Sequence, residues 1–275
     1  MTVTLVALPA IALYLSAALA LARPLFGSHA PMGRLAMWLA GMAVILHAWL
    51  LLGLHRGTLD LHFFAVLSLV AWVVSAMTIG VNLFRPIAGL GIFIFPLTAL
   101  FVALDPLTVN FTTLDAFVAP TTAPELKDWQ IKLHITFAFL GFSVLSIAAV
   151  LAILLAIQER ALRRSQFKHW LRALPPLTLA ESLLFRMIAV GFALLTLTLL
   201  TGVLFVDNLF GQHLVHKTVL SIIAWAIFGA LLLGRWRYGW RGSRAVNLTL
   251  LGMGMLFLAF IGTKFVLELV LHRTL

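Results

Sequence analysis

The chain has 275 residues, of which 63% are hydrophobic and only 10% are charged, and it contains no cysteine. With a mean hydropathy of +1.10, this composition excludes an ordinary soluble domain and is typical of an integral membrane protein. The formal net charge is +10, but the basic residues lie in short breaks between apolar stretches. They therefore indicate membrane orientation and not nucleic-acid binding. The lack of cysteine excludes disulfides, thiolate metal ligands and thiol nucleophiles.

Apolar stretches long enough to cross a bilayer follow one another along almost the whole chain, since about 20 residues make one helical crossing. We therefore predict an all-α polytopic membrane protein, a bundle of eight transmembrane helices forming one membrane domain over residues 1–275. The predicted spans are 3–22, 35–54, 61–84, 87–104, 131–157, 183–206, 216–234 and 245–270.

Charge predicts which way the helices point. Thirteen of the nineteen Lys and Arg residues lie in or next to the breaks 23–34, 85–86, 158–182 and 235–244, whereas seven of the nine acids lie on the opposite side. By the positive-inside rule, these breaks face the cytoplasm and both termini lie outside. We expect a multi-pass protein of the bacterial cytoplasmic (inner) membrane, with membrane lipid as its first partner.

Two longer breaks interrupt the predicted bundle. Segment 105–130 is rich in Thr, Pro and Asp and is predicted to be an outer loop. Segment 158–182 begins QERALRRSQFKHWLRAL, a mixture of basic and apolar residues that predicts a basic cytoplasmic amphipathic segment on anionic lipid. Thr178 and Glu181 have the spacing of a capping box at the start of the next span.

The histidines carry the only metal or proton chemistry that the sequence suggests. His47 lies inside the second span, where an imidazole must be paired, line a cavity or bind a metal. A hydrogen bond between helices would satisfy it equally well. His134 stands at the entrance of the fifth span, where it could be a second iron ligand or a solvated interfacial residue.

Two further histidine positions give weaker signals. His213 and His216 are three residues apart at the entry to the seventh span, which would place them on one helical face, but a wetted loop accounts for them better. His272 lies near the C-terminus. No HExxH motif and no carboxylate cluster accompanies these residues, so no metal site beyond a haem iron is expected.

The second half of the chain carries a family resemblance. In order, it contains KLHITFAFLGFSVLSIAAVLAILLAIQERALR, LLFRMIAVGFALLTLTLLTGVLF and KTVLSIIAWAIFGALLLGRWRYGWRGSRAV. These segments, within residues 131–272, resemble the cytochrome c assembly family that includes CcsA, CcmC and CcmF, and look closest to its YpjD/HemX-like branch. The family's Trp-rich WWD element is replaced here by VDNLFGQHLVHKTV.

The resemblance implies a membrane protein that binds or relays haem, held non-covalently as b-type haem, in support of cytochrome c assembly. It implies axial ligands at His134 and His272, with His47 as the counterpart of a buried family histidine. The haem hypothesis takes His134 and His47 as the ligands, with His272 or His216 as alternates. It also implies an assembly factor and not an enzyme, with other cytochrome c maturation proteins or an apocytochrome as partners.

Two other functions remain open. The basic cytoplasmic loops could hold a cytoplasmic partner, which would make the chain a membrane regulator or scaffold, for example of tetrapyrrole synthesis. The outer histidines could instead capture a metal ion or small molecule for transport. The spans lack a row of membrane-centre carboxylates, which disfavours the transporter.

Overall fold

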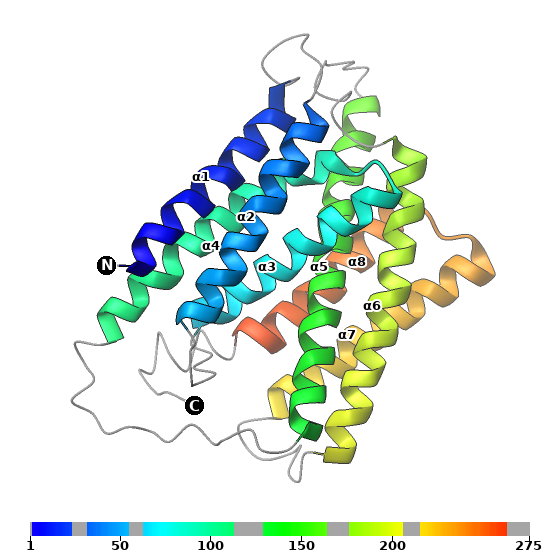
Figure 1. The fold of residues 1–275 in the computed structure, drawn as a ribbon. Coiled ribbons are helices and arrows are strands. Elements are labelled where there is room, and N and C mark those ends of the chain that lie inside the picture. Colours follow the sequence, from blue (N-terminus) through cyan, green and yellow to red (C-terminus); the bar gives the residue numbers. More distant parts are fainter. Residues whose placement is uncertain are drawn as a thin grey trace. The chain divides into compact units, whose positions relative to one another are not determined.

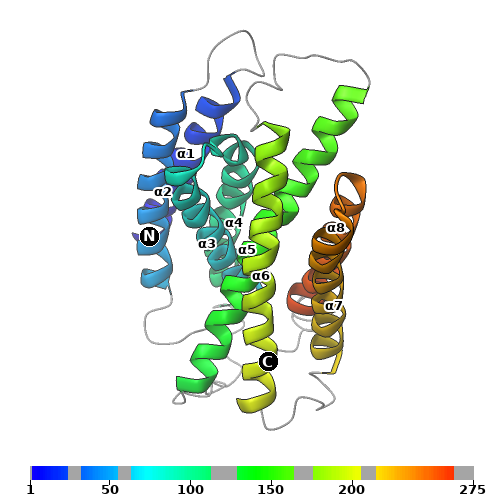
Figure 2. The ribbon, with the colours of Figure 1, turned by 90° about the vertical axis from the view of Figure 1, so that its right-hand side faces the viewer.

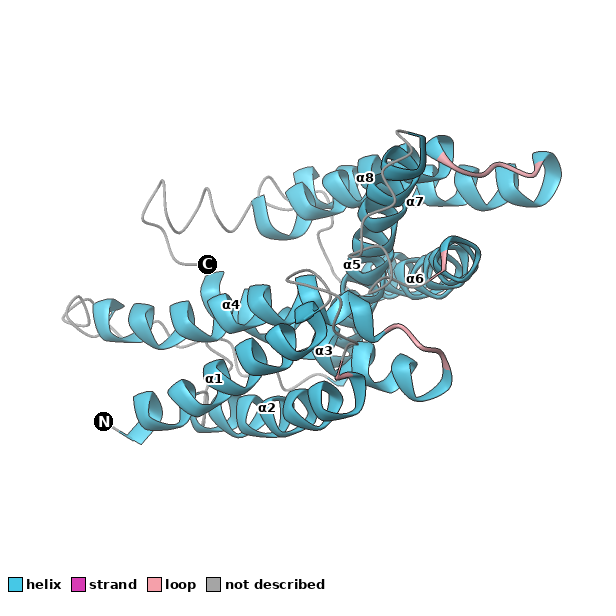
Figure 3. Cartoon of the chain, turned by 90° about the horizontal axis from the view of Figure 1, so that it is seen from above, coloured by secondary structure: helices cyan, strands magenta, loops and turns pink. Residues whose placement is uncertain are grey.

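The structure is a computed structural model that describes residues 2–23, 32–54, 63–112, 129–163, 176–205 and 215–262. Within these ranges the chain forms helices and no strands (Figure 3), which confirms the all-α prediction. The α-helices are α1 (Thr2–Ala22), α2 (Gly33–Leu54), α3 (Phe63–Phe84), α4 (Gly91–Thr112), α5 (Trp129–Arg163), α6 (Leu177–Phe205), α7 (Val215–Tyr238) and α8 (Ser243–Phe257). The 3-10 turn Ala88–Leu90 precedes α4, and the π-helical turn Leu258–Gly262 follows α8.

Seven helices in the described residues are long and apolar enough to cross a membrane, and Val6–Ala22 is a shorter apolar helix. The chain is therefore a polytopic membrane protein, as predicted. The count of eight crossings and the placement of both termini outside stay predictions.

The described helices cluster into two compact units, α1–α4 and α5–α8 (labelled in Figure 1). The single membrane domain stays a prediction. In the first unit, α1 packs on α2 and α4, and α3 packs on α4 and α2. The core includes Tyr14 and Phe95, both fully buried. Gly91 allows this packing, because a Cβ there would collide with the Phe95 ring.

The second unit is built around α5, which packs on both α6 and α8, while α7 packs on α8 and α6. Figure 2 shows α7 and α8 side by side. The α5–α6 contact is close because Gly191 receives Leu145, and Gly252 of α8 receives the Phe228 ring of α7. Phe260 stacks on Phe142 with ring centroids 5.0 Å apart. Small residues thus face large ones across these helix pairs.

Three helix boundaries differ from the prediction. α4 continues through Asp105 to Thr112, so the first part of the predicted outer loop is helical, and Asp105 is fully buried. α5 continues to Arg163, where Arg163 and Glu159 pair at 2.9 Å, so the start of the predicted amphipathic segment belongs to α5. α6 begins at Leu177 and not at 183. Residues 164–175 lie outside the described residues.

Candidate functional site

His134 lies near the start of α5 and is half-buried within the second unit. Its Nδ1 is 3.0 Å from the hydroxyl oxygen of Thr201, which lies near the end of α6. α5 and α6 are antiparallel neighbours, so the start of one meets the end of the other (Figure 2). The contact joins two residues separated by 67 positions in the sequence.

The other contacts of Thr201 determine the direction of this hydrogen bond. The Thr201 hydroxyl lies 2.8 Å from the carbonyl oxygen of Leu197 and 3.0 Å from that of Thr198, both on its own helix. A carbonyl can only accept, and a hydroxyl has a single proton to donate. The Thr201 oxygen therefore accepts from Nδ1–H of His134, which leaves the lone pair of the neutral imidazole on Nε2.

The same hydrogen-bond pattern occurs at histidines that bind a metal. A ligating imidazole usually donates its second ring N–H to a protein acceptor, which sets both the tautomer and the ring orientation. The contact with Thr201 uses Nδ1 of His134 and leaves Nε2 out of it. Sequence reasoning selected His134 by residue type and missed Thr201, although Thr201 lies within the quoted segment LLTLTLLTG.

His47 has a different environment, in the core of the first unit. It is fully buried, with Nε2 3.0 Å from the hydroxyl oxygen of Ser68 and Nδ1 3.4 Å from that of Tyr14. The Tyr14 and His47 rings meet edge to face at 6.0 Å. Both ring nitrogens of His47 therefore contact side chains of neighbouring helices, the arrangement that the hydrogen-bond alternative described. Its role as a haem ligand stays a prediction.

The other predicted ligands are only partly described. His216 is an exposed residue in the first turn of α7, within the same unit as His134. His213 and His272 lie outside the described residues. Among the residues that the structure describes, no group of three or more His, Asp or Glu side chains could hold a metal ion.

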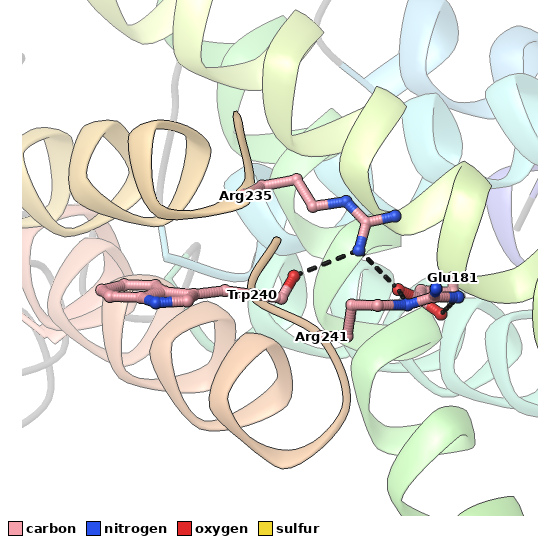
Figure 4. A network of polar contacts seen from close by, with 4 residues as sticks. All are labelled: Glu181, Arg235, Trp240 and Arg241. Atoms are coloured by element: carbon pink, nitrogen blue, oxygen red, sulfur yellow. Dashed lines mark hydrogen bonds and ion pairs between the residues drawn. The ribbon is translucent and has the colours of Figure 1, made fainter. Parts of the chain in front are cut away.

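A second polar cluster lies at the opposite end of the second unit (Figure 4). Arg241 donates to both carboxylate oxygens of Glu181, at 2.8 and 2.9 Å, and Arg235 donates to one of them at 2.9 Å. Arg235 also donates to the carbonyl oxygen of Trp240 at 3.2 Å. Glu181 thus ties α6 to the turn between α7 and α8, and the capping-box interpretation was wrong.

The turn itself explains the GWRGSR part of the sequence. Gly239 and Gly242 have φ values of 64° and 57°, which favour glycine because a Cβ is strained there. The Trp240 ring covers Gly234 so closely that any Cβ there would collide with it. Bonding to Glu181, and then their mutual attraction, raises the pKa of the Arg241 guanidinium. This signature segment therefore builds a fixed turn that is tied to α6 through Glu181.

The chain is similar in sequence to a known protein family. The model of the family described as "Cytochrome C assembly protein" matches residues 32–271. The chain belongs to this family. The match begins far before residue 131, so the family likeness extends into the first unit as well as the second.

Members of the family with curated descriptions include proteins from two branches. The chain is 36% identical over 137 residues to "Inner membrane protein YpjD" of Escherichia coli (strain K12), covering 50% of this chain and 52% of that protein. It is 27% identical over 167 residues to "Cytochrome c biogenesis protein CcsA" of Guillardia theta, covering 54% of each. The matches thus span about half the length of these relatives. No solved structure matches the chain.

These findings confirm the resemblance to the CcsA-like and YpjD branch of the cytochrome c assembly family. They also agree with the predicted localisation, because YpjD is described as an inner membrane protein and the described helices include seven of membrane-spanning length. This member of the family is a multi-pass protein of the inner membrane.

Proposed function

We propose that this chain binds haem on its α5–α8 unit through Nε2 of His134 and relays it in support of cytochrome c assembly. The observation that carries the proposal is the hydrogen bond from His134 Nδ1 to Thr201, at 3.0 Å. The Thr201 hydroxyl donates its proton to the carbonyl oxygen of Leu197, so its oxygen accepts from Nδ1–H of His134. This keeps the imidazole in the tautomer whose Nε2 lone pair is available to iron.

The family and the composition support the same function. The described relatives include cytochrome c biogenesis proteins, so we infer that the partners are other maturation proteins or an apocytochrome. With no cysteine in the chain, thioether bonds to haem cannot form, and binding is non-covalent. We infer an assembly factor and not an enzyme.

The described residues fit haem through one ligand. When bound, haem supplies an iron that accepts the imidazole lone pair of His134. The α5–α8 unit contributes the apolar surroundings, and Thr201 keeps the imidazole oriented. His272 remains the proposed second ligand from the resemblance, with His216 at the start of α7 as the alternate.

A cytoplasmic regulator is the competing function. Some of the basic residues that would bind its partner are paired within the chain. Arg235 and Arg241, two of the basic residues expected to bind a partner, are both engaged by Glu181. Because Glu181 offsets one of these two positive charges, this cluster offers a partner less net charge than the unpaired basic residues of this face, such as Arg237.

The test is the visible absorption spectrum of the detergent-purified full chain supplied with haem, oxidised and after reduction with dithionite. We expect His134→Ala to lose or shift the Soret band. His134→Gly should regain the wild-type spectrum when imidazole is added, because free imidazole can occupy the vacated ligand position.

His47→Ala is the matched control, since it removes a buried imidazole from the other unit. Under the proposal it leaves the Soret position unchanged. A spectrum lost with His47→Ala and retained with His134→Ala would assign the iron to His47 and overturn the proposed ligand. A wild-type chain that binds no haem would overturn the proposed function itself.

A further inference from the structure

A groove lies at one end of the first unit, lined by the start of α2, the end of α3 and the turn that follows it. Its volume is about 670 Å³. This size is within the range of pockets that hold small molecules. The groove does not involve His47 or any other residue discussed above as a haem ligand.

One wall of the groove consists of exposed apolar side chains. Trp38 on α2 is 76% exposed, and Leu83 and Phe84 at the end of α3 are 78% and 85% exposed. In a membrane protein such side chains face hydrocarbon, and Trp is enriched where hydrocarbon meets the headgroups. This wall fits acyl chains.

The mouth of the groove is cationic. Arg34 and Arg85 both line it, both are exposed, and no acidic residue lines it. Among the residues that the structure describes, neither guanidinium has a hydrogen bond or an ion pair. Two cations without a local counter-charge border the apolar wall.

The combination of these features selects the ligand. A soluble phosphate would use the arginines but leave the apolar wall in contact with water, whereas a zwitterionic lipid would use the wall but bring no net charge. An anionic phospholipid satisfies both parts, and basic pockets between membrane helices on the cytoplasmic side are known to hold such headgroups. The charge distribution predicts that this end is cytoplasmic.

We propose that this groove is a binding site for an anionic phospholipid, with the phosphate at Arg34 and Arg85 and an acyl chain along Trp38, Leu83 and Phe84. Gly41 provides the floor on α2, and a Cβ built there meets nothing within 4 Å. The groove therefore stays open next to the helix backbone, and a side chain at this position would extend into it.

The experiment measures lipid binding to the delipidated full chain in detergent by native mass spectrometry, with phosphatidylglycerol and phosphatidylcholine as probes. Near an anionic surface each basic residue contributes about 1 kcal/mol, or about fivefold in affinity. We therefore expect Arg34→Gln with Arg85→Gln to weaken phosphatidylglycerol binding about 25-fold and to leave phosphatidylcholine binding nearly unchanged.

The charge-matched control is Arg186→Gln with Arg237→Gln, which removes two exposed positive charges from the second unit and should retain phosphatidylglycerol binding. Gly41→Phe should weaken both lipids, because it fills the acyl groove and leaves both arginines in place. Circular dichroism of each variant shows whether the helices remain folded.

Three results would overturn the proposal. Equal losses of phosphatidylglycerol binding in the groove variant and the control variant would show that the effect depends only on net charge. Unchanged phosphatidylglycerol binding by Arg34→Gln with Arg85→Gln would show that these arginines do not bind the lipid. Competition by millimolar inorganic phosphate, with no effect of Gly41→Phe, would make the groove a site for a soluble anion.

Discussion

At His134, the choice of ring tautomer depends on a hydroxyl that lies 67 residues away in the sequence. Thr201 does not touch the proposed iron and acts as a positioning residue. Its effect is chemical as well as geometric, because an acceptor at Nδ1–H raises the basicity of Nε2. The haem spectrum and potential should therefore respond to Thr201 even though His134 itself is unchanged.

We expect Thr201→Val to weaken haem binding about 10- to 100-fold, the usual effect of losing an outer-shell partner, and to raise the haem midpoint potential. Valine has nearly the same shape but cannot accept the Nδ1 proton. Haem titration and a spectroelectrochemical titration measure the two effects. Thr201→Ser keeps the hydroxyl and should behave as wild type, whereas equal effects of both variants would contradict the positioning role.

His47 allows a different test at the same scale. We expect Ser68→Ala to lower the free energy of unfolding of the detergent-solubilised chain by about 1 kcal/mol, and its melting temperature with it. The substitution leaves Nε2 of a fully buried imidazole without its partner. Ser16→Ala is the control, since Ser16 is exposed and bonds only its own helix. Equal melting temperatures for both variants would contradict an interhelical role for this contact.

At the scale of the elements, the sequence predicted where helices occur better than where they end. Hydropathy located every described α-helix, because about 20 apolar residues have no other stable arrangement in lipid. The ends moved because polar residues can continue a helix when they find partners there. Arg163 pairs with Glu159 one turn earlier, and Asp105 is buried inside α4 where a loop was expected.

The candidate site was predictable only in part for a related reason. His134 stands out in an apolar segment by its residue type alone. Thr201 does not, because threonine is common in membrane helices and often bonds only its own helix, as Thr198 does. Only the packing of α5 on α6 distinguishes Thr201 from its neighbours. The roles of Glu181 and the glycines of the α7–α8 turn were hidden in the same way.

The Glu181 cluster should stabilise the second unit more than an ordinary surface ion pair does. Glu181 is largely buried and serves two arginines, whereas Glu159 forms one exposed pair along its own helix. We expect Glu181→Gln to lower the free energy of unfolding by about 1.5–3 kcal/mol, the range for hydrogen bonds to charged groups, and Glu159→Gln by about 0.3–0.5 kcal/mol. Unfolding in denaturing detergent measures both, and equal losses would contradict the structural role assigned to Glu181.

At the scale of the whole molecule, the charge count makes a prediction about orientation. The chain has no cysteine, so any single introduced cysteine reports one position without a background. We expect a membrane-impermeant maleimide, added to spheroplasts, to label Lys132→Cys at the outer end of α5. The same reagent should label Arg237→Cys, at the end of α7, only after the membrane is permeabilised.

The reverse labelling pattern would show that the orientation is opposite to the predicted one. The lipid groove would then lie on the outer face. Labelling of both positions from outside would instead show that the membrane was not intact. Lys132 and Arg237 are both exposed. A difference in labelling therefore reports the side of the membrane and not burial within the protein.

The length of α5 has a mechanical consequence. Its 35 residues form one helix of about 52 Å, well beyond the ~30 Å hydrocarbon core of a bilayer. His134 stands near one end, and Glu159 stands near the other, where its carboxylate comes within 4 Å of a Cβ placed on Gly242. One continuous helix therefore connects the proposed iron ligand with the α7–α8 turn, and both ends of it are too far apart to lie in the hydrocarbon core together.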